Sequence, residues 1–275
     1  TFLNITREDL IQRIKECWAS PFTHRAIYYR NEQGFDHDVV DIAVVVQRMV
    51  DAEKSGVMFT SHPSTGESRI IIEAAWGLGE AVVSGSVSPD NYVIDRETGE
   101  TIEATVADKK IMMLKDEETG ETVEQSVPDD KRNARVLDDD ELERLVELGE
   151  RAETHYDEPQ DIEWALADDD VYMLQSRPIT TISEDSDDET ANGGENGDVL
   201  LNGLGASPGI STGSVRIVRK LDQLDKVGEG DIIVTEMTTP DMVPAMKRAS
   251  GIITDEGGMT SHAAIVAREL GAPAV

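Results

Sequence analysis

Hydrophobic and polar positions recur along this chain with periods that predict both helices and strands. Apolar residues fall at helical spacing over residues 10–18 and again over 137–155, where acidic residues at the start of the run favour a helix N-terminus. Runs rich in β-branched or apolar residues predict strands. These runs lie at residues 41–50, 70–75, 215–218, 232–234 and 252–254, and a short helix is expected at 243–248. The pattern therefore predicts a mixed α/β fold (α+β).

Two alternating segments around residue 170 predict a β-hairpin with one polar face. Asp161 and Glu163 share a side of the first strand, because residues i and i+2 of a strand point the same way. Gln175 and Arg177 share a side of the second strand. Two carboxylates, an amide and a guanidinium suit Mg²⁺ together with a polyphosphate. An ordinary hairpin with an exposed polar face would show the same alternation.

A change of composition divides the chain. Residues 183–197 read SEDSDDETANGGENG, with many acids, three glycines and no apolar periodicity. Such a segment buries too little surface to order itself, so we expect a flexible acidic linker over 183–199. It separates a first domain, 1–182, from a second, 200–275. A long surface loop within one domain is the alternative.

The charge balance is strongly acidic. The chain carries 56 acidic against 25 basic residues, a net charge of −31. Such a surface repels nucleic acid and anionic membranes, which argues against both as partners, and a nucleotide site would have to be locally basic or use a metal. An acidic interaction protein is one explanation. The acids are spread over the whole length and lysine is scarce, which favours a halophilic protein of a salt-rich cytoplasm.

The chain contains one cysteine, Cys17, which excludes an intrachain disulfide and suits a reducing, cytoplasmic setting. No apolar run approaches the roughly 20 residues of a membrane-spanning helix. No secretory signal peptide is visible at the start.

The most specific chemistry lies near the end of the chain. The stretch 257–262 reads GGMTSH and is followed by a run that predicts an amphipathic helix. His262 would therefore stand at a helix N-terminus, where free N–H groups and the helix dipole favour a bound anion. We expect His262 to accept a phosphoryl group, with Thr260 and Ser261 orienting the imidazole or binding phosphate oxygens. A residue that merely neighbours a helix cap is the alternative, and Arg268 is expected to form a structural ion pair.

This stretch resembles the phosphohistidine signature of the phosphoenolpyruvate-utilising enzymes. The segments DIEWA (161–165) and YMLQSRP (172–178) resemble the end of the ATP-grasp domain in the same family. The resemblance implies that Asp161 and Glu163 bind Mg²⁺. It also implies that Gln175 acts in catalysis and that Arg177 lies at the phosphates.

Further segments carry the resemblance. EAAWGLGE (73–80) resembles a glycine-containing turn beside the nucleotide. This resemblance implies that Glu73, Gly77 and Gly79 contact the nucleotide or its phosphates. VVVQRMV (44–50), with Gln47, resembles the strand that lines the adenine pocket. Lys109 and Lys110 also fit, with Lys110 as a candidate phosphate contact, although a solvated lysine pair is the simpler interpretation.

The resemblance implies the C-terminal portion of an ATP-grasp domain followed by a phosphohistidine swivelling domain with a β/β/α core. The implied reaction is of the phosphoenolpyruvate synthase type: ATP, pyruvate and water give AMP, phosphoenolpyruvate and phosphate through phosphohistidine, a step of gluconeogenesis. A pyruvate phosphate dikinase type and a non-catalytic phosphocarrier or regulatory fragment are the alternatives.

The family pattern extends past both ends of this sequence. We expect an internal fragment that lacks the start of the ATP-grasp domain and the barrel that binds pyruvate, and that is inactive if nothing supplies them. A complementing polypeptide or a homo-oligomer is the partner this would require.

Overall fold

A computed structural model describes residues 1–37, 40–63, 66–179 and 200–275. The chain forms two compact units, one of Thr1–Asp51 with Leu114–Glu124 and one of Ala52–Met113 with Gln125–Val275. The expected linker at 183–199 lies outside the described residues, so the predicted domain boundary there stays a prediction.

The helices of the first unit lie in its N-terminal segment. Its elements are α1 (Leu10–Ala19), the 3₁₀ turn η1 (Ser20–Phe22) and α2 (His24–Gln33), so the helix predicted at 10–18 is confirmed. The hydroxyl of Thr23 caps α2 by accepting from the N–H of Ala26, and Gly34 ends it in the left-handed region at φ 70°.

The strand predicted at 41–50 is wrong. Residues 40–51 are described, are mostly exposed and belong to no strand. Their β-branched residues favour an extended backbone, but a strand also needs a neighbour that supplies N–H and C=O groups. Within the described part of the chain, no segment pairs with them in a ladder.

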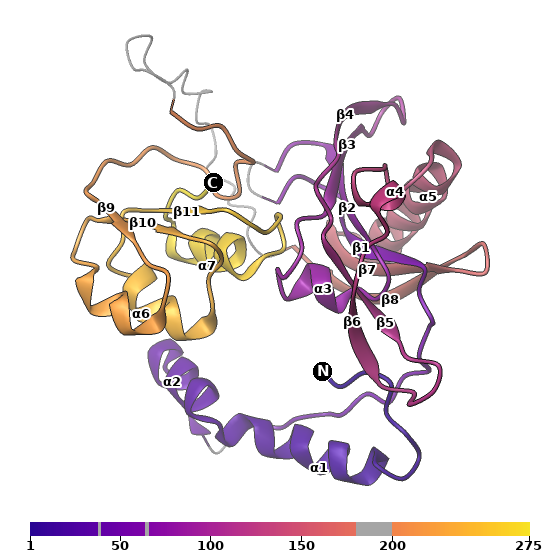
Figure 1. Cartoon of the computed structure of the whole chain (residues 1–275), viewed down its shortest axis with the longest axis horizontal. Coiled ribbons are helices and arrows are strands. Elements are labelled where there is room, and N and C mark those ends of the chain that lie inside the picture. The colour runs from indigo at the N-terminus through magenta and orange to yellow at the C-terminus, as the bar shows by residue number, and fades with distance from the viewer. Residues whose placement is uncertain (38–39, 64–65, 180–199) are drawn as a thin grey trace. The chain divides into compact units, whose positions relative to one another are not determined.

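A six-stranded antiparallel sheet dominates the second unit (Figure 1). Its order is β4-β3-β2-β1-β7-β8. The strands are β1 (Lys54–Phe59), β2 (Arg69–Trp76), β3 (Asp90–Asp95), β4 (Thr101–Thr105), β7 (Gln160–Ala167) and β8 (Asp170–Pro178). The predicted strand at 70–75 and the predicted hairpin are therefore confirmed. A separate two-stranded sheet pairs β5 (Ile111–Lys115) with β6 (Thr122–Ser126).

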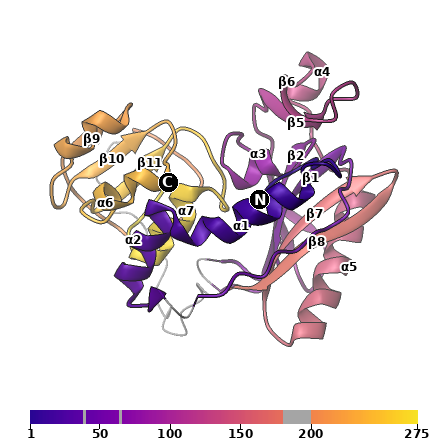
Figure 2. The ribbon, with the colours of Figure 1, turned by 90° about the horizontal axis from the view of Figure 1, so that it is seen from below.

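One face of the large sheet is covered by α5 (Asp139–Tyr156), as Figure 2 shows. This helix confirms the one predicted at 137–155, and Asp138 and Glu141 form a reciprocal capping box at its start. Its buried Leu142 and Leu145 join a core with strand residues on that face, among them Met58, Ile72, Ile162 and Trp164. The short α4 (Asp129–Arg132) precedes it.

A three-stranded parallel sheet of order β11-β10-β9 forms in the C-terminal part. Its elements are β9 (Val215–Ile217), η3 (Leu221–Lys226), β10 (Ile232–Thr235), η4 (Pro240–Met242), α6 (Val243–Met246), β11 (Gly251–Thr254) and α7 (His262–Leu270). These confirm the strands predicted at 215–218, 232–234 and 252–254 and the two predicted helices. Glycine ends α7, with Gly271 at φ 66°.

The other face of the large sheet shares one core with these C-terminal elements. The apolar residues of this face alternate with those beneath α5, because successive strand residues point to opposite faces. They pack with the short helix α3 (Glu80–Val83) and with the C-terminal sheet and helices. The shared core includes Val57, Phe59, Ile71, Ala81, Ile233, Met246 and Ala264.

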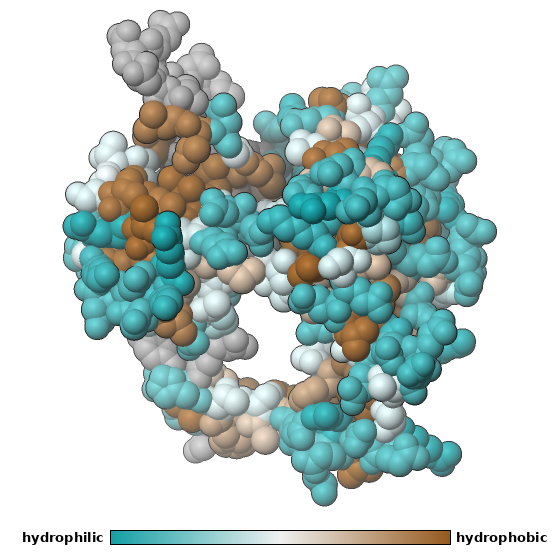
Figure 3. All heavy atoms as spheres, viewed as in Figure 1, coloured by the Kyte–Doolittle hydropathy of each residue, from teal (hydrophilic) through white to brown (hydrophobic). Residues whose placement is uncertain are grey.

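The surface in Figure 3 is largely hydrophilic, in keeping with the charge of the chain. Exposed apolar side chains gather over residues 200–217, where they include Leu200, Leu201, Ile210 and Ile217. Within the described ranges, no helix has both the length and the apolar character needed to cross a membrane.

The lysine pair at 109–110 is not a solvated pair. Lys109 and Asp90 form an ion pair with both side chains fully buried. Asp90 also accepts from the N–H groups of Ala107 and Val136, at 2.9 and 2.8 Å. Nearby, burial raises the pKa of Tyr92 to about 12. The lysine at 110 is exposed, as expected, so the two neighbours have opposite environments.

Lys109→Met should lower the free energy of unfolding by about 3–5 kcal/mol, because it leaves the Asp90 carboxylate buried without a counter-charge. The matched variant Lys110→Met removes an exposed ion pair and should change it by less than about 1 kcal/mol. Urea unfolding followed by circular dichroism measures both. Equal effects would show that burial of the Asp90 pair does not matter to stability.

Candidate functional site

His262 stands at the first position of α7. The hydroxyl of Ser261 caps this helix by accepting from the N–H of Ala264, at 3.3 Å. The Nδ1 atom of the half-buried imidazole lies 2.8 Å from the hydroxyl oxygen of Thr238. Thr238 follows β10 and is itself buried. The ring is therefore held by a side chain that lies 24 residues before it.

The two hydroxyl residues next to His262 have other partners. Thr260 donates its hydroxyl to Glu73 at 2.7 Å, and Ser261 serves the helix cap. The hydrogen bond to the imidazole is made with Thr238, a residue that no sequence motif marks, and the alternative expectation that Thr260 and Ser261 bind phosphate oxygens stays a prediction. The only local signal of Thr238 is its position after a predicted strand.

The register of the large sheet brings several predicted site residues into one row. Gln175 lies opposite Glu163, Glu163 opposite Val57, and Val57 opposite Glu73. Residues directly opposite in antiparallel strands point to the same face. Glu73, predicted from a different segment, therefore shares a face with the hairpin residues, and this is the face that packs with the C-terminal elements.

The row continues to Asn91, which lies opposite Glu73. Asn91 is buried, and within the described part of the chain its side-chain nitrogen has no hydrogen-bond partner. No sequence motif marks this position. A buried amide without a hydrogen-bond partner thus lies beside the Glu73 carboxyl on this face.

Asp161 and Arg177 form the next row of the same face. Arg177 donates to the Asp161 carboxylate from Nε at 2.8 Å and from Nη2 at 2.7 Å. Burial raises the pKa of Asp161, against the lowering effect of Arg177. Burial also raises the pKa of Glu163, and the charge of Asp161 adds to that rise.

Two buried carboxyl groups with raised pKa values on one face provide the setting in which a divalent cation is favoured. Asp161 and Glu163 fit Mg²⁺ in residue type and in placement on one face. Among the residues that the structure describes, no group of three or more His, Cys, Asp or Glu side chains comes together. A cation held here would complete its coordination with ligand phosphate oxygens and water, which is the usual mode of Mg²⁺.

Among the residues that the structure describes, Arg268 has no ion-pair partner, contrary to expectation. Its guanidinium donates to two backbone carbonyls, those of Met259 at 2.7 Å and Ala206 at 3.0 Å. Burial lowers the pKa of Arg268, and the nearby charges of Glu73 and Asp161 oppose that shift. The guanidinium therefore joins the loop before α7 to the segment around Ala206 through backbone carbonyls.

The remaining predicted residues of this unit are placed as follows. Gly77 takes the left-handed conformation at φ 78°, and Gly79 is the N-cap of the short α3. Lys110 pairs with Glu256 at 3.1 Å, at the start of the histidine loop. Their expected contacts with a nucleotide stay predictions.

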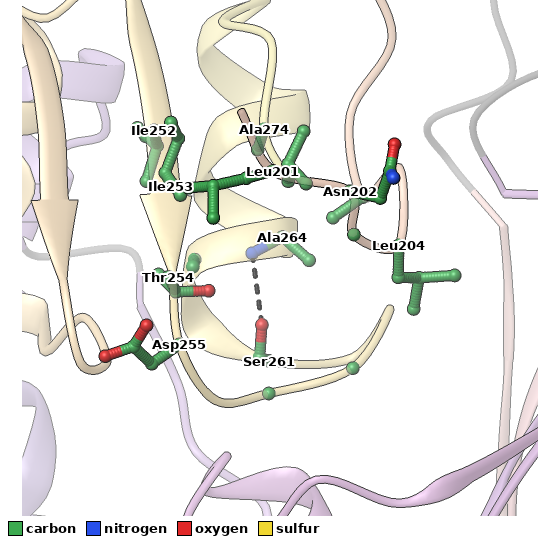
Figure 4. A pocket seen from close by; sticks show the side chains of 16 residues that line it. Leu201, Asn202, Leu204, Ile252, Ile253, Thr254, Asp255, Ser261, Ala264 and Ala274 are labelled. Carbon is green, nitrogen blue, oxygen red and sulfur yellow. Dashed lines mark hydrogen bonds between the residues drawn. The ribbon is translucent and has the colours of Figure 1, made fainter. Parts of the chain in front are cut away.

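A cavity of about 270 Å³ lies beside the histidine loop (Figure 4). Its wall is mostly apolar, with Leu201, Ile252 and Ala264 among the lining residues, and Thr254, Asp255 and Ser261 at one side. His262 is not among the lining residues. The cavity is therefore separate from the polar row on the large sheet.

The first unit holds a larger cavity of about 880 Å³, within the size range of ligand sites. Gln47 lines it, together with much of the segment 42–49. Its lining includes four basic residues, Arg7, Arg13, Arg48 and Lys115, and no acidic residue among those described. In a chain of net charge −31, this cavity meets the condition for an anionic ligand with an apolar part.

Comparisons with known proteins found matching family models and relatives. A family model described as "Pyruvate phosphate dikinase, AMP/ATP-binding domain" matches residues 1–196, and one described as "PEP-utilising enzyme, mobile domain" matches residues 227–275. A probable phosphoenolpyruvate synthase of Methanothermobacter thermautotrophicus is 60% identical over 276 residues, which cover 100% of this chain and 40% of the relative.

Two further relatives are phosphoenolpyruvate synthases. That of Pyrococcus furiosus is 50% identical over 284 residues, with 100% of this chain and 35% of the relative covered. That of Aeropyrum pernix is 39% identical over 311 residues, with 100% and 38% covered. The chain thus spans about two fifths of the length of the curated relatives it matches.

Glu163→Gln should stabilise the fold at neutral pH. Because burial and Asp161 raise the pKa of Glu163 in the folded state, the folded chain binds this proton more tightly than the unfolded chain. The contribution of Glu163 to the free energy of unfolding therefore falls as the pH rises above 4.5, the ordinary pKa of a glutamate. A glutamine at this position has no such pH dependence. The urea midpoint of the variant should exceed that of the wild type at pH 7, and the difference should vanish below pH of about 4.

The exposed Glu103 of β4 supplies the control, since Glu103→Gln makes the same chemical change at the surface and should shift the midpoint little at any pH. A Glu163→Gln midpoint that stays below the wild type at pH 7 would contradict the interpretation.

Proposed function

This chain belongs to the family of the pyruvate phosphate dikinase AMP/ATP-binding domain, and from that premise we propose that it is an ATP-dependent phosphotransferase of the phosphoenolpyruvate synthase type. His262 carries the phosphoryl group. The observation that supports this most is the imidazole at the start of α7, oriented by Thr238, in a loop that packs on the carboxylate-bearing face of the large sheet.

The proposed step begins with His262 in one tautomer. Nδ1–H donates to the hydroxyl oxygen of Thr238, which leaves the lone pair on Nε2. Nε2 attacks the β-phosphorus of ATP, a new N–P bond forms, and the bond from that phosphorus to the α,β-bridging oxygen breaks. The electron pair leaves with AMP. Water then takes the γ-phosphoryl group as phosphate, so that His262 retains the β-phosphoryl group.

The polar face of the sheet supplies the remaining roles. Asp161 and Glu163 would hold Mg²⁺, which neutralises charge on the phosphates when it is bound. Arg177 and Gln175 would contact phosphate oxygens, and Lys110 adds a positive charge at the loop. The basic cavity beside Gln47 in the first unit suits the nucleotide through its charge and size.

Transfer of the phosphoryl group from His262 to pyruvate is proposed from the similarity to the phosphoenolpyruvate synthases named above. The barrel that the family resemblance implies would bind the pyruvate. The similarity to phosphoenolpyruvate synthases favours water over phosphate as the γ-acceptor, and so favours this type over the dikinase type. A phosphocarrier that lacks ATP turnover is the second candidate. Cytoplasmic location and adaptation to high salt, from the spread acidity, belong to the proposal.

Incubation of the chain with Mg-ATP in molar KCl should label His262. Label at the β-phosphorus should stay on the protein in acid-labile, base-stable form, and label at the γ-phosphorus should appear as free phosphate. His262→Ala should lose all of the label. Phosphopeptide mapping with ATP labelled at either the β- or the γ-phosphorus measures this. A folded wild type that takes up no β-label would reject ATP-dependent transfer by this chain and would favour the phosphocarrier.

Thr238→Val should slow β-labelling of His262 by about tenfold, because the near-isosteric side chain cannot accept from Nδ1–H and no longer fixes the tautomer. The ATP concentration that gives half the maximal rate should stay within about twofold, since Thr238 contacts the imidazole. Equal loss of rate with Thr239→Val, the adjacent threonine, would contradict a specific role for Thr238.

A further inference from the structure

Glu73 is a carboxyl group that the proposed phosphoryl transfer does not use. It lies in the middle of β2, fully buried. One oxygen accepts from the N–H of Met259. The other accepts from the N–H of Thr260 at 3.3 Å and from the Thr260 hydroxyl at 2.7 Å. All three donors thus come from two consecutive residues of the loop that ends at His262.

A fully buried carboxyl group destabilises the fold unless hydrogen bonds compensate for the loss of water. A carboxyl group without water is tolerated only when its oxygens are hydrogen-bonded, and here only the loop supplies the donors among the contacts that the structure shows. Burial raises the pKa of Glu73, and the three hydrogen bonds oppose that rise. Glu73 and the loop therefore depend on each other.

The shape of the loop fits the same carboxyl group. A Cβ atom at Gly258 would overlap the carboxyl of Glu73, so only glycine lets the loop approach. Gly257 takes φ 118°, a left-handed conformation that glycine adopts without strain. The glycine pair before His262 thus brings the next two N–H groups onto Glu73.

The other contacts of the loop with this part of the chain are weaker. Lys110 and Glu256 form an exposed ion pair, a type that contributes little. Ser88 accepts from the N–H of Gly257 at 3.4 Å, a long hydrogen bond. Glu73 is the buried anchor among these contacts.

We propose that Glu73 is a positioning residue for the phosphoacceptor loop: through Thr260 and the Met259 N–H it fixes the backbone from which His262 projects, and it does not bind nucleotide. This deepens the proposed phosphoryl transfer to His262 and rests on it. Since only Ser261 separates Thr260 from His262, a shift of the Thr260 backbone moves the start of α7. Phosphoryl transfer is sensitive to such displacements of the attacking atom.

The test uses Glu73→Gln in the full chain. Whichever way the amide turns, one acceptor oxygen becomes an NH₂ group, so the N–H of Met259 or of Thr260 loses its acceptor. The variant is neutral at a buried position and should fold. Amide hydrogen exchange should become at least about tenfold faster at Met259 or Thr260, and exchange in α5 should not change.

The kinetic arm separates positioning from nucleotide contact. With Glu73→Gln, the maximal rate of His262 β-labelling should fall at least about tenfold while the ATP concentration for half-maximal rate stays within about twofold. Glu103→Gln, the same change on exposed β4, should alter neither. A rise in the half-maximal ATP concentration, with loop exchange unchanged, would overturn the inference and make Glu73 a nucleotide contact.

A second variant approaches the contact from the loop. Thr260→Val removes only the hydroxyl, and its effect combined with Glu73→Gln should be smaller than the product of the two single effects. Independent effects would overturn the inference. If the wild type takes no label, the proposed function fails. The amide hydrogen exchange of Met259 and Thr260 still decides whether Glu73 fixes the loop backbone.

Discussion

The burial of the Glu73 carboxyl is the constraint that organises the C-terminal half of this protein. A carboxyl group in the middle of a covered strand is unfavourable unless every oxygen is paired. The pairing comes from the loop that carries His262, and the loop in turn requires glycine at 257 and 258 to reach it. The placement of His262, the proposed phosphoacceptor, therefore follows from how the Glu73 carboxyl is hydrogen-bonded.

The buried face of the large sheet shows how a few carboxyl groups can have special properties in a chain of net charge −31. On the surface, one acidic side chain more or less changes little, since water and salt screen it. Beneath the C-terminal elements, burial raises the pKa of Glu73, Asp161 and Glu163 alike. Burial, more than composition, thus makes these three carboxyl groups responsive to a cation or to a donor.

Much of the fold could be predicted from the sequence because its determinants are local. Helical spacing located α1 and α5, and the two-residue period of the hairpin put Asp161 and Glu163 on one side of the first strand and Gln175 and Arg177 on one side of the second. The strand expected at 41–50 failed for the opposite reason, since β-branched residues cannot specify a partner strand. For the site, local pattern and resemblance identified His262 and the residue types of the polar face.

The contacts that assemble the site could not be predicted in the same way, because they join distant segments. Glu73 and Thr260 are 187 residues apart, and Thr238 precedes His262 by 24 residues. A motif such as GGMTSH shows which side chains are present but not which neighbours they bind. Its two hydroxyls were expected to orient the imidazole or to bind phosphate oxygens; in the structure, one satisfies a buried carboxyl and the other caps the helix. Because such a loop must first satisfy its own backbone and its buried neighbours, the group that orients a reactive side chain often comes from another segment of the fold.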